Sequence, residues 1–379
     1  MLAWERHQIG LSIAEVADKL NMTRVEVASW EDGDALPSLL DLELLADLYL
    51  CPVGHFFLDS PPMGGIAALD FRGLDKSKAD SLSYEPRRRL RQFLRLVELA
   101  TSWLRQMGQP WDVSLPAIQL DASITSVAAT AVRALGIDWD VRSNWTSSEE
   151  AFAGWRDAVE RQRIFVFSLT LPAGQVRGAS VWQPEGPPAI LVNHSDIEYA
   201  TGRLFTLLHE YAHLLLRRSG LVCDFRGQPE AAAVETFANR FAAEAIVPTS
   251  AFRDRLAATN LEGYRDWWTE RQLDTLREPF HASRDTVAII LETLRLAPAE
   301  YYRNRRAAWD RRRVFGRGGP GSRQTKPQRR YRELGAAMST LLVSAAGQES
   351  ISKLDIAEAL DMRLARLPDF VTAARVQQH

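Results

Sequence analysis

Two histidines lie four residues apart in an apolar stretch, where residues 209–213 are His-Glu-Tyr-Ala-His. Residues at this spacing lie one turn apart on the same face of a helix, so both imidazoles can point at one ion. Glu210 lies one step round the helix, where its carboxylate can take a proton from metal-bound water without being a ligand. The segment predicts a catalytic divalent metal site with His209 and His213 as ligands and Glu210 as general base. The alternative is a helix with two partly exposed histidines, but burying both without a shared partner would be costly.

A metal site of this kind needs a third ligand, and a second helical pattern over residues 231–246 offers acids for it. A glycine-containing turn would fold this helix back beside the first, with Glu235 facing the histidines. Asn239 lies one turn further along the same face and could orient a ligand from outside the ligand set. Glu230 and Glu244 remain alternatives for the third position.

Three predicted strands and a long helix would hold these residues in place. Residues 164–169, 175–182 and 189–193 are predicted as strands, and 197–218 as one helix. The pattern indicates an α+β domain, mostly helical, with a small sheet beside the helices. The strand 189–193 leads directly into the helix, so it could be a sheet edge that pairs with an extended substrate, which makes Asn193 a candidate substrate contact. An ordinary core strand is the alternative.

The N-terminal residues predict two short helices joined by a tight turn. Ser12 is expected to cap a helix that ends at Leu20, and Thr23 a second helix that ends near Glu31 and is stopped by Gly33. This arrangement is typical of a helix-turn-helix domain. The expected shared core consists of Val16, Ala17, Leu20, Val25, Val27 and Trp30.

The charge of this module argues against DNA as its main partner. Its second helix would expose Thr23, Arg24, Glu26 and Ser29, yet residues 1–60 carry three cations against eleven acids. Because DNA binding draws most of its affinity from lysine and arginine on phosphates, this balance favours protein contact or autoinhibition. DNA binding remains the alternative.

Two family resemblances add to this interpretation. Residues 10–37 resemble the Cro/C1-type (XRE) repressor domain, and 40–48 and 51–58 resemble its last two helices. The segments "RLFTLLHEYAHLLL" and "ETFANRFAAEAIVP" resemble the ImmA/IrrE metallopeptidase family, as do 164–167, 176–178 and 188–193.

The second resemblance implies a zincin-like peptidase domain, with Glu235 as the third ligand and Zn²⁺ as the ion, Mn²⁺ being the alternative. It also implies a protein substrate, an XRE-type repressor or antitoxin, whose cleavage relieves repression in a stress, phage or mobile-element response. Two alternatives remain: a transcription regulator whose peptidase-like domain is a sensor or inert, and a toxin-like effector. The oxyanion-stabilising group is open among His194, Tyr264 and His281.

Composition sets the organisation of the chain. Of 379 residues 25% are charged, the net charge is -2, and there are two cysteines, of which Cys223 is expected to be a small buried residue. No signal peptide or membrane span is predicted, so a cytoplasmic protein without membrane contact is expected. Four regions follow: a helix-turn-helix domain (1–60), a linker and packing helix (61–110), a peptidase domain (111–300), and a basic linker with a helical C-terminal tail (301–379).

The basic linker is a separate candidate for binding. Residues 301–330 carry eleven arginines or lysines against one acid, interleaved with aromatic residues. Such a mixture can contact nucleic acid through phosphate pairing and ring stacking. A solvated helix, or pairing with the acidic N-terminus, is the alternative.

Overall fold

The computed structural model describes residues 1–61, 82–113, 115–172, 176–182, 186–195, 200–217, 229–312, 325–348 and 351–376. The chain divides into two compact units, Met1–Leu99 and Ala100–His379. The division falls inside one helix, α7 (Tyr84–Gln106), which is expected over 85–106. In the described residues no helix combines the length and the apolar character needed to cross a bilayer.

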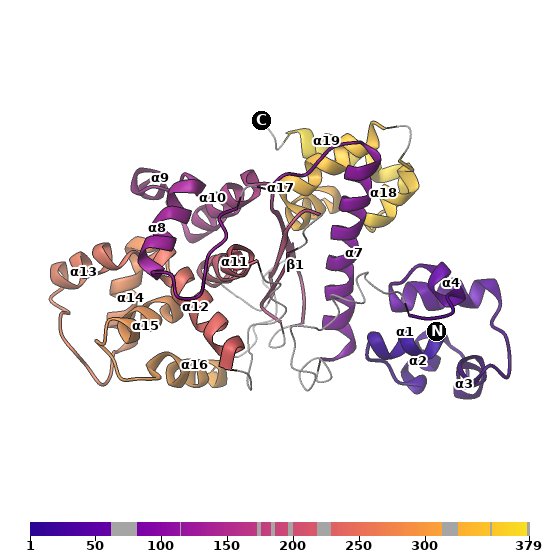
Figure 1. Ribbon diagram of the computed structural model, residues 1–379, viewed down its shortest axis with the longest axis horizontal. Coiled ribbons are helices and arrows are strands. Elements are labelled where there is room, and N and C mark those ends of the chain that lie inside the picture. Colours follow the sequence, from indigo (N-terminus) through magenta and orange to yellow (C-terminus); the bar gives the residue numbers. More distant parts are fainter. Residues whose placement is uncertain are drawn as a thin grey trace. The chain divides into compact units, whose positions relative to one another are not determined.

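In its described residues the first unit contains helices and no strand, and its N-terminal helices are indigo in Figure 1. Its elements are α1 (Leu2–Gln8), α2 (Ile13–Leu20), α3 (Arg24–Asp32), α4 (Leu39–Tyr49), the 3-10 helix η1 (Val53–Phe57) and the start of α7. Ser12, Thr23 and Ser38 each form a reciprocal capping box with the acid three residues later. Gly33 ends α3 in the left-handed region at φ 81°. The predicted helix pair is confirmed, whereas the last expected helix, 51–58, is a short 3-10 helix.

The core of this unit corrects one predicted residue. Val16, Ala17 and Val27 are buried together, and Leu20 and Trp30 pack against them from half-buried positions. Val25 was expected in this core but is 78% exposed. Since each helical residue turns the side chain by about 100°, Val25 and Val27 face nearly opposite directions, and only one of them can enter the core.

Buried ion pairs hold α1 against its neighbours. Glu5 is fully buried and pairs with His55 Nδ1 at 2.9 Å and with Arg91 Nη2 at 2.6 Å. Arg6 donates two hydrogen bonds to the carboxylate of Glu31, at 2.7 and 2.8 Å. These contacts satisfy charges that would otherwise be costly to bury, and they tie α1 to α3, η1 and α7.

The second unit is built around a three-stranded sheet of β1 (Phe165–Leu169), β2 (Gly178–Val181) and β3 (Ala189–Asn193). The strand order is β1-β3-β2, with β3 parallel to β1 and antiparallel to β2. Of the two alternatives for residues 189–193, the sheet edge is therefore wrong and the core strand is confirmed. β3 is buried at all five positions, as is typical of a strand with neighbours on both sides.

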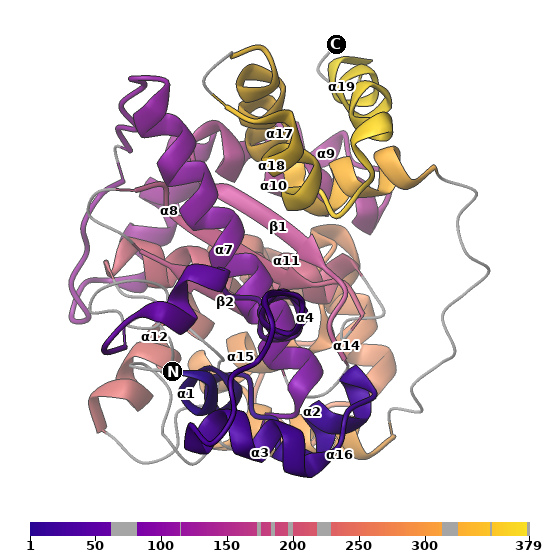
Figure 2. The same ribbon diagram turned by 90° about the vertical axis from the view of Figure 1, so that its right-hand side faces the viewer.

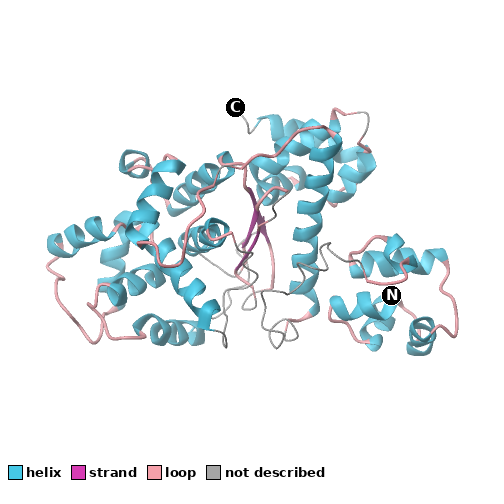
Figure 3. Ribbon diagram, viewed as in Figure 1, coloured by secondary structure: helices cyan, strands magenta, loops and turns pink. Residues whose placement is uncertain are grey.

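Helices make up most of the rest of the described second unit (Figure 3). They are α8 (Ile124–Leu135), α9 (Trp139–Ser143), α10 (Ser148–Arg161), α11 (Ala200–Leu215), α12 (Pro229–Ile246), α13 (Thr249–Ala258), α14 (Glu270–Arg277), η2 (Glu278–Phe280), α15 (Arg284–Thr293), α16 (Tyr301–Arg312), α17 (Lys326–Ala346), α18 (Lys353–Ala359), η3 (Leu364–Arg366) and α19 (Leu367–Val376). α11 packs against β2, β3 and α12, and α17 lies along β1 (Figure 2). The predicted α+β class, mostly helical with a small sheet, is confirmed.

The C-terminal helix α17 bends where it meets the sheet. Gly335 has φ 80°, and a Cβ there would lie 1.8 Å from Oε1 of Glu160. Oε2 of Glu160 accepts a hydrogen bond from the backbone N–H of Ala336 at 3.0 Å. Burial raises the pKa of Glu160 to about 7, although Arg156 beside it lowers that pKa. Only glycine fits this bend.

Candidate metal centre

The two histidines of the motif lie on α11 and face one another. Nε2 of His209 and Nε2 of His213 are 3.1 Å apart, and the two side chains are nearly fully buried. α11 is apolar on almost all sides, which explains its burial between the sheet and α12. Two imidazoles are thereby held in an apolar interior with their ring nitrogens turned to one point.

Glu235 of α12 completes the group. Its Oε2 lies 3.3 Å from His209 Nε2, and its Oε1 lies 3.2 Å from His213 Nε2. Its side chain is 12% exposed, and Oε1 makes no hydrogen bond of normal geometry. Burial alone would raise the pKa of Glu235, but the two imidazoles beside it lower that pKa to about 2. This carboxylate is therefore held ionised.

The spacing of these three donors fits a tetrahedral ion. Two ligands at 2.0–2.1 Å from Zn²⁺ in tetrahedral geometry are separated by about 3.3 Å. The three observed separations are 3.1, 3.2 and 3.3 Å. Two ring nitrogens and one buried carboxylate oxygen face one another here. Without a cation, there are too few protons between them to satisfy all three acceptors. Among the described residues, these three side chains form the group of histidine and acid that could hold a metal.

Asn239 lies one turn beyond Glu235 and contacts the first histidine. Nδ1 of His209 donates a hydrogen bond to Oδ1 of Asn239 at 3.1 Å. Because the proton is then on Nδ1, the lone pair of Nε2 points toward His213 and Glu235. The amide thus fixes both the ring orientation and the tautomer that a metal ligand needs.

Glu210 follows His209 on α11 and is fully buried. Its Oε2 accepts a hydrogen bond from Ser180 Oγ of β2 at 2.8 Å. A Cβ at Gly178, two residues earlier on β2, would lie 2.9 Å from Oε1 of Glu210. The sheet therefore approaches this carboxylate so closely that only glycine fits. Ser180 is not among the residues predicted from the sequence, although the neighbouring residues 176–178 carry part of the family resemblance.

The other acids considered for the third ligand lie elsewhere. Glu244 accepts hydrogen bonds from the backbone N–H and the hydroxyl of Thr249, at 3.0 and 2.5 Å, so it caps the start of α13. The side chain of Glu230 lies outside the described residues. Asn193, the candidate substrate contact, is fully buried at the end of the central strand. Its side chain binds the backbone of Leu171, Ser195 and Val176, which connects loops inside the fold.

The three candidates for stabilising an oxyanion contact other groups. His194 Nδ1 lies 3.3 Å from an Arg203 nitrogen. Tyr264 is 57% exposed and donates its hydroxyl to Asp266. His281 lies 3.2 Å from the backbone oxygen of Trp145. Cys223 lies outside the described residues.

The expected recognition face of α3 carries little positive charge. Thr23 and Glu26 are engaged in their capping box, and Ser29 donates its hydroxyl to the backbone oxygen of Glu26 at 2.8 Å. Arg24 is exposed and is the one cation of α3. The helix therefore offers a single arginine where a DNA-binding helix usually offers several basic groups.

Two arginines of the basic stretch are engaged within the fold. Arg305 is 5% exposed, and its guanidinium stacks on the rings of Trp267 and Trp309, at 4.2 and 5.0 Å from their centres. Arg306 pairs with Asp285, and residues 313–324 lie outside the described part. Aromatic and basic residues of α16 thus stack on each other.

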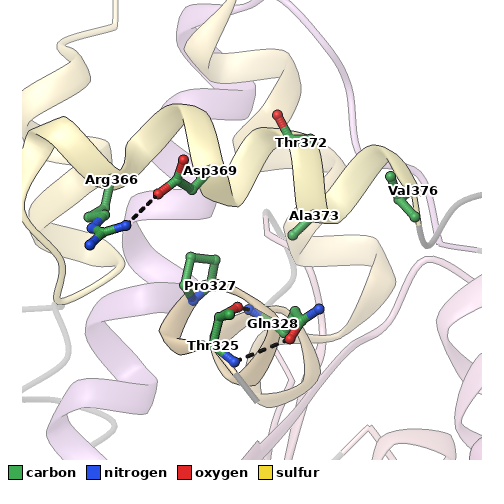
Figure 4. Close-up of a pocket in the computed structure, with 8 residues that line it drawn as sticks. All are labelled: Thr325, Pro327, Gln328, Arg366, Asp369, Thr372, Ala373 and Val376. Carbon is green, nitrogen blue, oxygen red and sulfur yellow. Dashed lines mark hydrogen bonds and ion pairs between the residues drawn. The ribbon is translucent and has the colours of Figure 1, made fainter. Parts of the chain in front are cut away.

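A surface hollow of about 410 Å³ lies apart from His209, His213 and Glu235. It is lined by residues of η3, α19 and the start of α17, among them Thr325, Arg366 and Asp369 (Figure 4). Arg366 and Asp369 pair at 2.9 Å across its rim. None of the ligand residues lines it.

The fold and the donor set resemble those of a metallopeptidase-type domain in a chain that begins with a helix-turn-helix domain. Residues 159–292 match the family model of the IrrE N-terminal-like domain, a peptidase family. Residues 2–56 match the helix-turn-helix family model. A search of curated proteins found no match. The two matches agree with the architecture expected from the sequence, and the first spans the sheet, α11 and α12.

Proposed function

We propose that the second unit is a metal-dependent endopeptidase that cleaves a protein substrate. His209, His213 and Glu235 bind the divalent ion, which we infer to be Zn²⁺, with Mn²⁺ as the alternative. The observation that carries this proposal is the convergence of three ligand atoms from two helices within 4.8 Å of one another. The match to a peptidase family supports it independently.

The residues around the ligands suit peptide hydrolysis. A divalent ion in such a site lowers the pKa of water and polarises a carbonyl group. Glu210 takes a proton from the attacking water and passes it to the departing amine nitrogen as the C–N bond breaks. Ser180 holds one carboxylate oxygen of Glu210 at 2.8 Å, which fixes its direction. Asn239 holds the ring of His209.

We further propose an XRE-type repressor or antitoxin as the substrate. The support is that one chain combines a helix-turn-helix domain with an IrrE-like peptidase domain, together with the family resemblance of the ligand helices. Cleavage would inactivate the repressor and release genes in a stress, phage or mobile-element response.

The alternative is a regulator whose peptidase-like domain senses a metal ion without cutting. The enclosure of the site favours it, since Glu210 is fully buried and the histidines are 2% and 1% exposed. A sensor needs only the ion to enter, whereas a peptidase must also admit a peptide.

Substitution of Glu210 separates the two. Glu210→Gln preserves shape and removes the base, so the variant should keep its metal and lose at least about a hundredfold in cleavage rate. Metal content is measured on the purified protein. Cleavage is measured by co-expression with candidate repressors encoded by neighbouring genes. Glu244→Gln, at an acid that caps α13, is the matched control and should cut normally. If the chain with Glu210→Gln still releases the repressed genes, the peptidase proposal fails and the metal-sensing regulator remains.

A further inference from the structure

Helix α4 in the first unit is apolar on two sides. Its inner side buries Leu42, Leu45, Ala46 and Tyr49. On the opposite side Leu39 and Leu40 are each 64% exposed and Leu44 is 39% exposed. Exposed leucines that gather on one side of a helix are typical of a surface that a partner covers. The outer side of α4 is therefore expected to have a partner that covers it.

The exposed leucines form a set with acids of the same side. At 100° per residue, Leu39, Leu40, Glu43, Leu44 and Asp47 fall within an arc of about 140°. We call these five residues the acidic leucine face. Single exposed leucines are normal on protein surfaces, but three within six residues on one side of a helix form a patch. Leu36, just before the helix, is 92% exposed and extends it along the chain.

The charge around this face selects the partner. Residues 1–60 carry eleven acids and three cations, and the start of α7 adds five arginines to the same unit, Arg87, Arg88, Arg89, Arg91 and Arg95. One cation, Arg6, is neutralised by Glu31, and another, Lys19, lies over the ring of Tyr84 at 4.4 Å. The α4 sequence, LLDLELLADLY, contains no basic residue. Such a surface repels the phosphates of DNA and the headgroups of anionic membranes, and attracts a cationic partner.

We propose that the acidic leucine face docks a basic amphipathic α-helix of another protein. α4 has eleven residues and is about 16 Å long, which suits packing against about three turns of a partner helix. Leu40 and Leu44, four apart, form the ridge that enters the partner's apolar groove, while Glu43 and Asp47 meet its lysines or arginines. This docking surface lies outside the peptidase site and does not depend on its activity.

The test uses the full chain and a defined probe. The probe is a fluorescent 20-residue helical peptide with leucines on one face and lysines on the other, and binding is measured by fluorescence anisotropy. Leu40→Ser/Leu44→Ser should weaken binding at least tenfold, since apolar burial is lost. Glu43→Lys/Asp47→Lys, which keeps the leucines, should weaken it about tenfold at low salt and flatten its salt dependence. Leu354→Ser/Leu364→Ser, at leucines 54% and 47% exposed in the second unit, is the matched control and should bind like the parent.

Other results would overturn the proposal. Equal binding of a scrambled peptide without an apolar face would show charge attraction alone. Binding of duplex DNA that is lost in Arg24→Ala would make α3 a DNA-contacting helix after all. A change of oligomeric state in the leucine variant, without loss of peptide binding, would identify a second copy as the occupant. Absence of probe binding by the parent chain also refutes the proposal. Metal content is recorded for every variant. A protein that keeps its metal but does not bind the probe then counts against the docking proposal alone, and not against the peptidase proposal.

Discussion

The two units differ in where their polar side chains lie. In the metal centre, the polar groups of α11 and α12 are buried and point at one another across two helices. In the helix-turn-helix unit, most acids lie on the surface, and the capping acids are satisfied by a partner three residues away. A buried polar group needs a shared partner, whereas an exposed one needs only water. The chemistry of the second unit therefore depends on a few residues, whereas the binding properties of the first depend on its whole surface.

The largest effect is expected when one of the three converging side chains of the metal centre is replaced. Glu235→Gln replaces the ionised donor with a neutral amide, so metal affinity should fall by more than about a hundredfold, given that even outer-shell partners of a ligand contribute 10–100-fold. At an ion concentration a thousand times the dissociation constant, the parent protein gains about 4 kcal/mol of stability from the ion. Removal of the ion by a chelator should therefore lower the melting temperature of the parent and leave that of the variant unchanged.

Glu244→Gln is the matched control for this experiment, because that acid caps α13 and belongs to the same helix. It should respond to the chelator as the parent does. Equal metal content in the parent and in Glu235→Gln would mean that the two histidines hold the ion by themselves or that another acid replaces Glu235.

The second prediction concerns the pH dependence of stability, to which a buried acid and an exposed acid should contribute differently. Burial raises the pKa of Glu160 to about 7, above the ordinary 4.5. The folded protein then holds a proton that the unfolded chain releases, so stability is greatest below pH 4.5 and falls as the pH rises through 7, by up to about 3 kcal/mol. Urea unfolding from pH 5 to 8 measures it. Glu160→Gln should lose this dependence, and Glu43→Gln, at an exposed acid of α4, should keep it.

The sequence predicted what depends on spacing along one helix. His209 and His213 share a face because they are four residues apart, and Asn239 follows Glu235 by the same rule. The capping residues Ser12 and Thr23 were likewise readable, since a cap and its partner are three residues apart. These features need no knowledge of how distant segments meet.

Features that depend on the order of distant elements were not predictable in this way. The central position of β3 follows from its pairing with both β1 and β2, and the chain order alone does not determine it. Ser180 reaches Glu210 only because β2 packs against α11. Val25 looked like a core residue by type, but the direction of α3 relative to α2 puts Val27 inside. Tertiary packing decides such positions.

A third, smaller effect is expected at the amide that orients a ligand. Asn239→Ala removes the acceptor for Nδ1–H of His209 and should weaken metal binding about 10–100-fold, because the ring loses its fixed tautomer. Asn239→Asp retains an acceptor and should bind the ion within about tenfold of the parent. Competition with a chelator of known affinity measures all three proteins. If Asn239→Ala binds as tightly as the parent, the packing of α11 alone orients the ring.

The smallest effects test the surface character of the first unit. Val27 is 1% exposed and Val25 is 78% exposed on the same helix. Val27→Ala leaves a cavity and should destabilise the unit by about 2 kcal/mol, whereas Val25→Ala should change its stability by less than about 0.5 kcal/mol. Hydrogen exchange of backbone amides in residues 1–60 reports the local opening free energy without interference from the second unit. Equal losses in both variants would mean that a contact covers Val25, and the outer surface of α3 would then belong to an interface rather than to solvent.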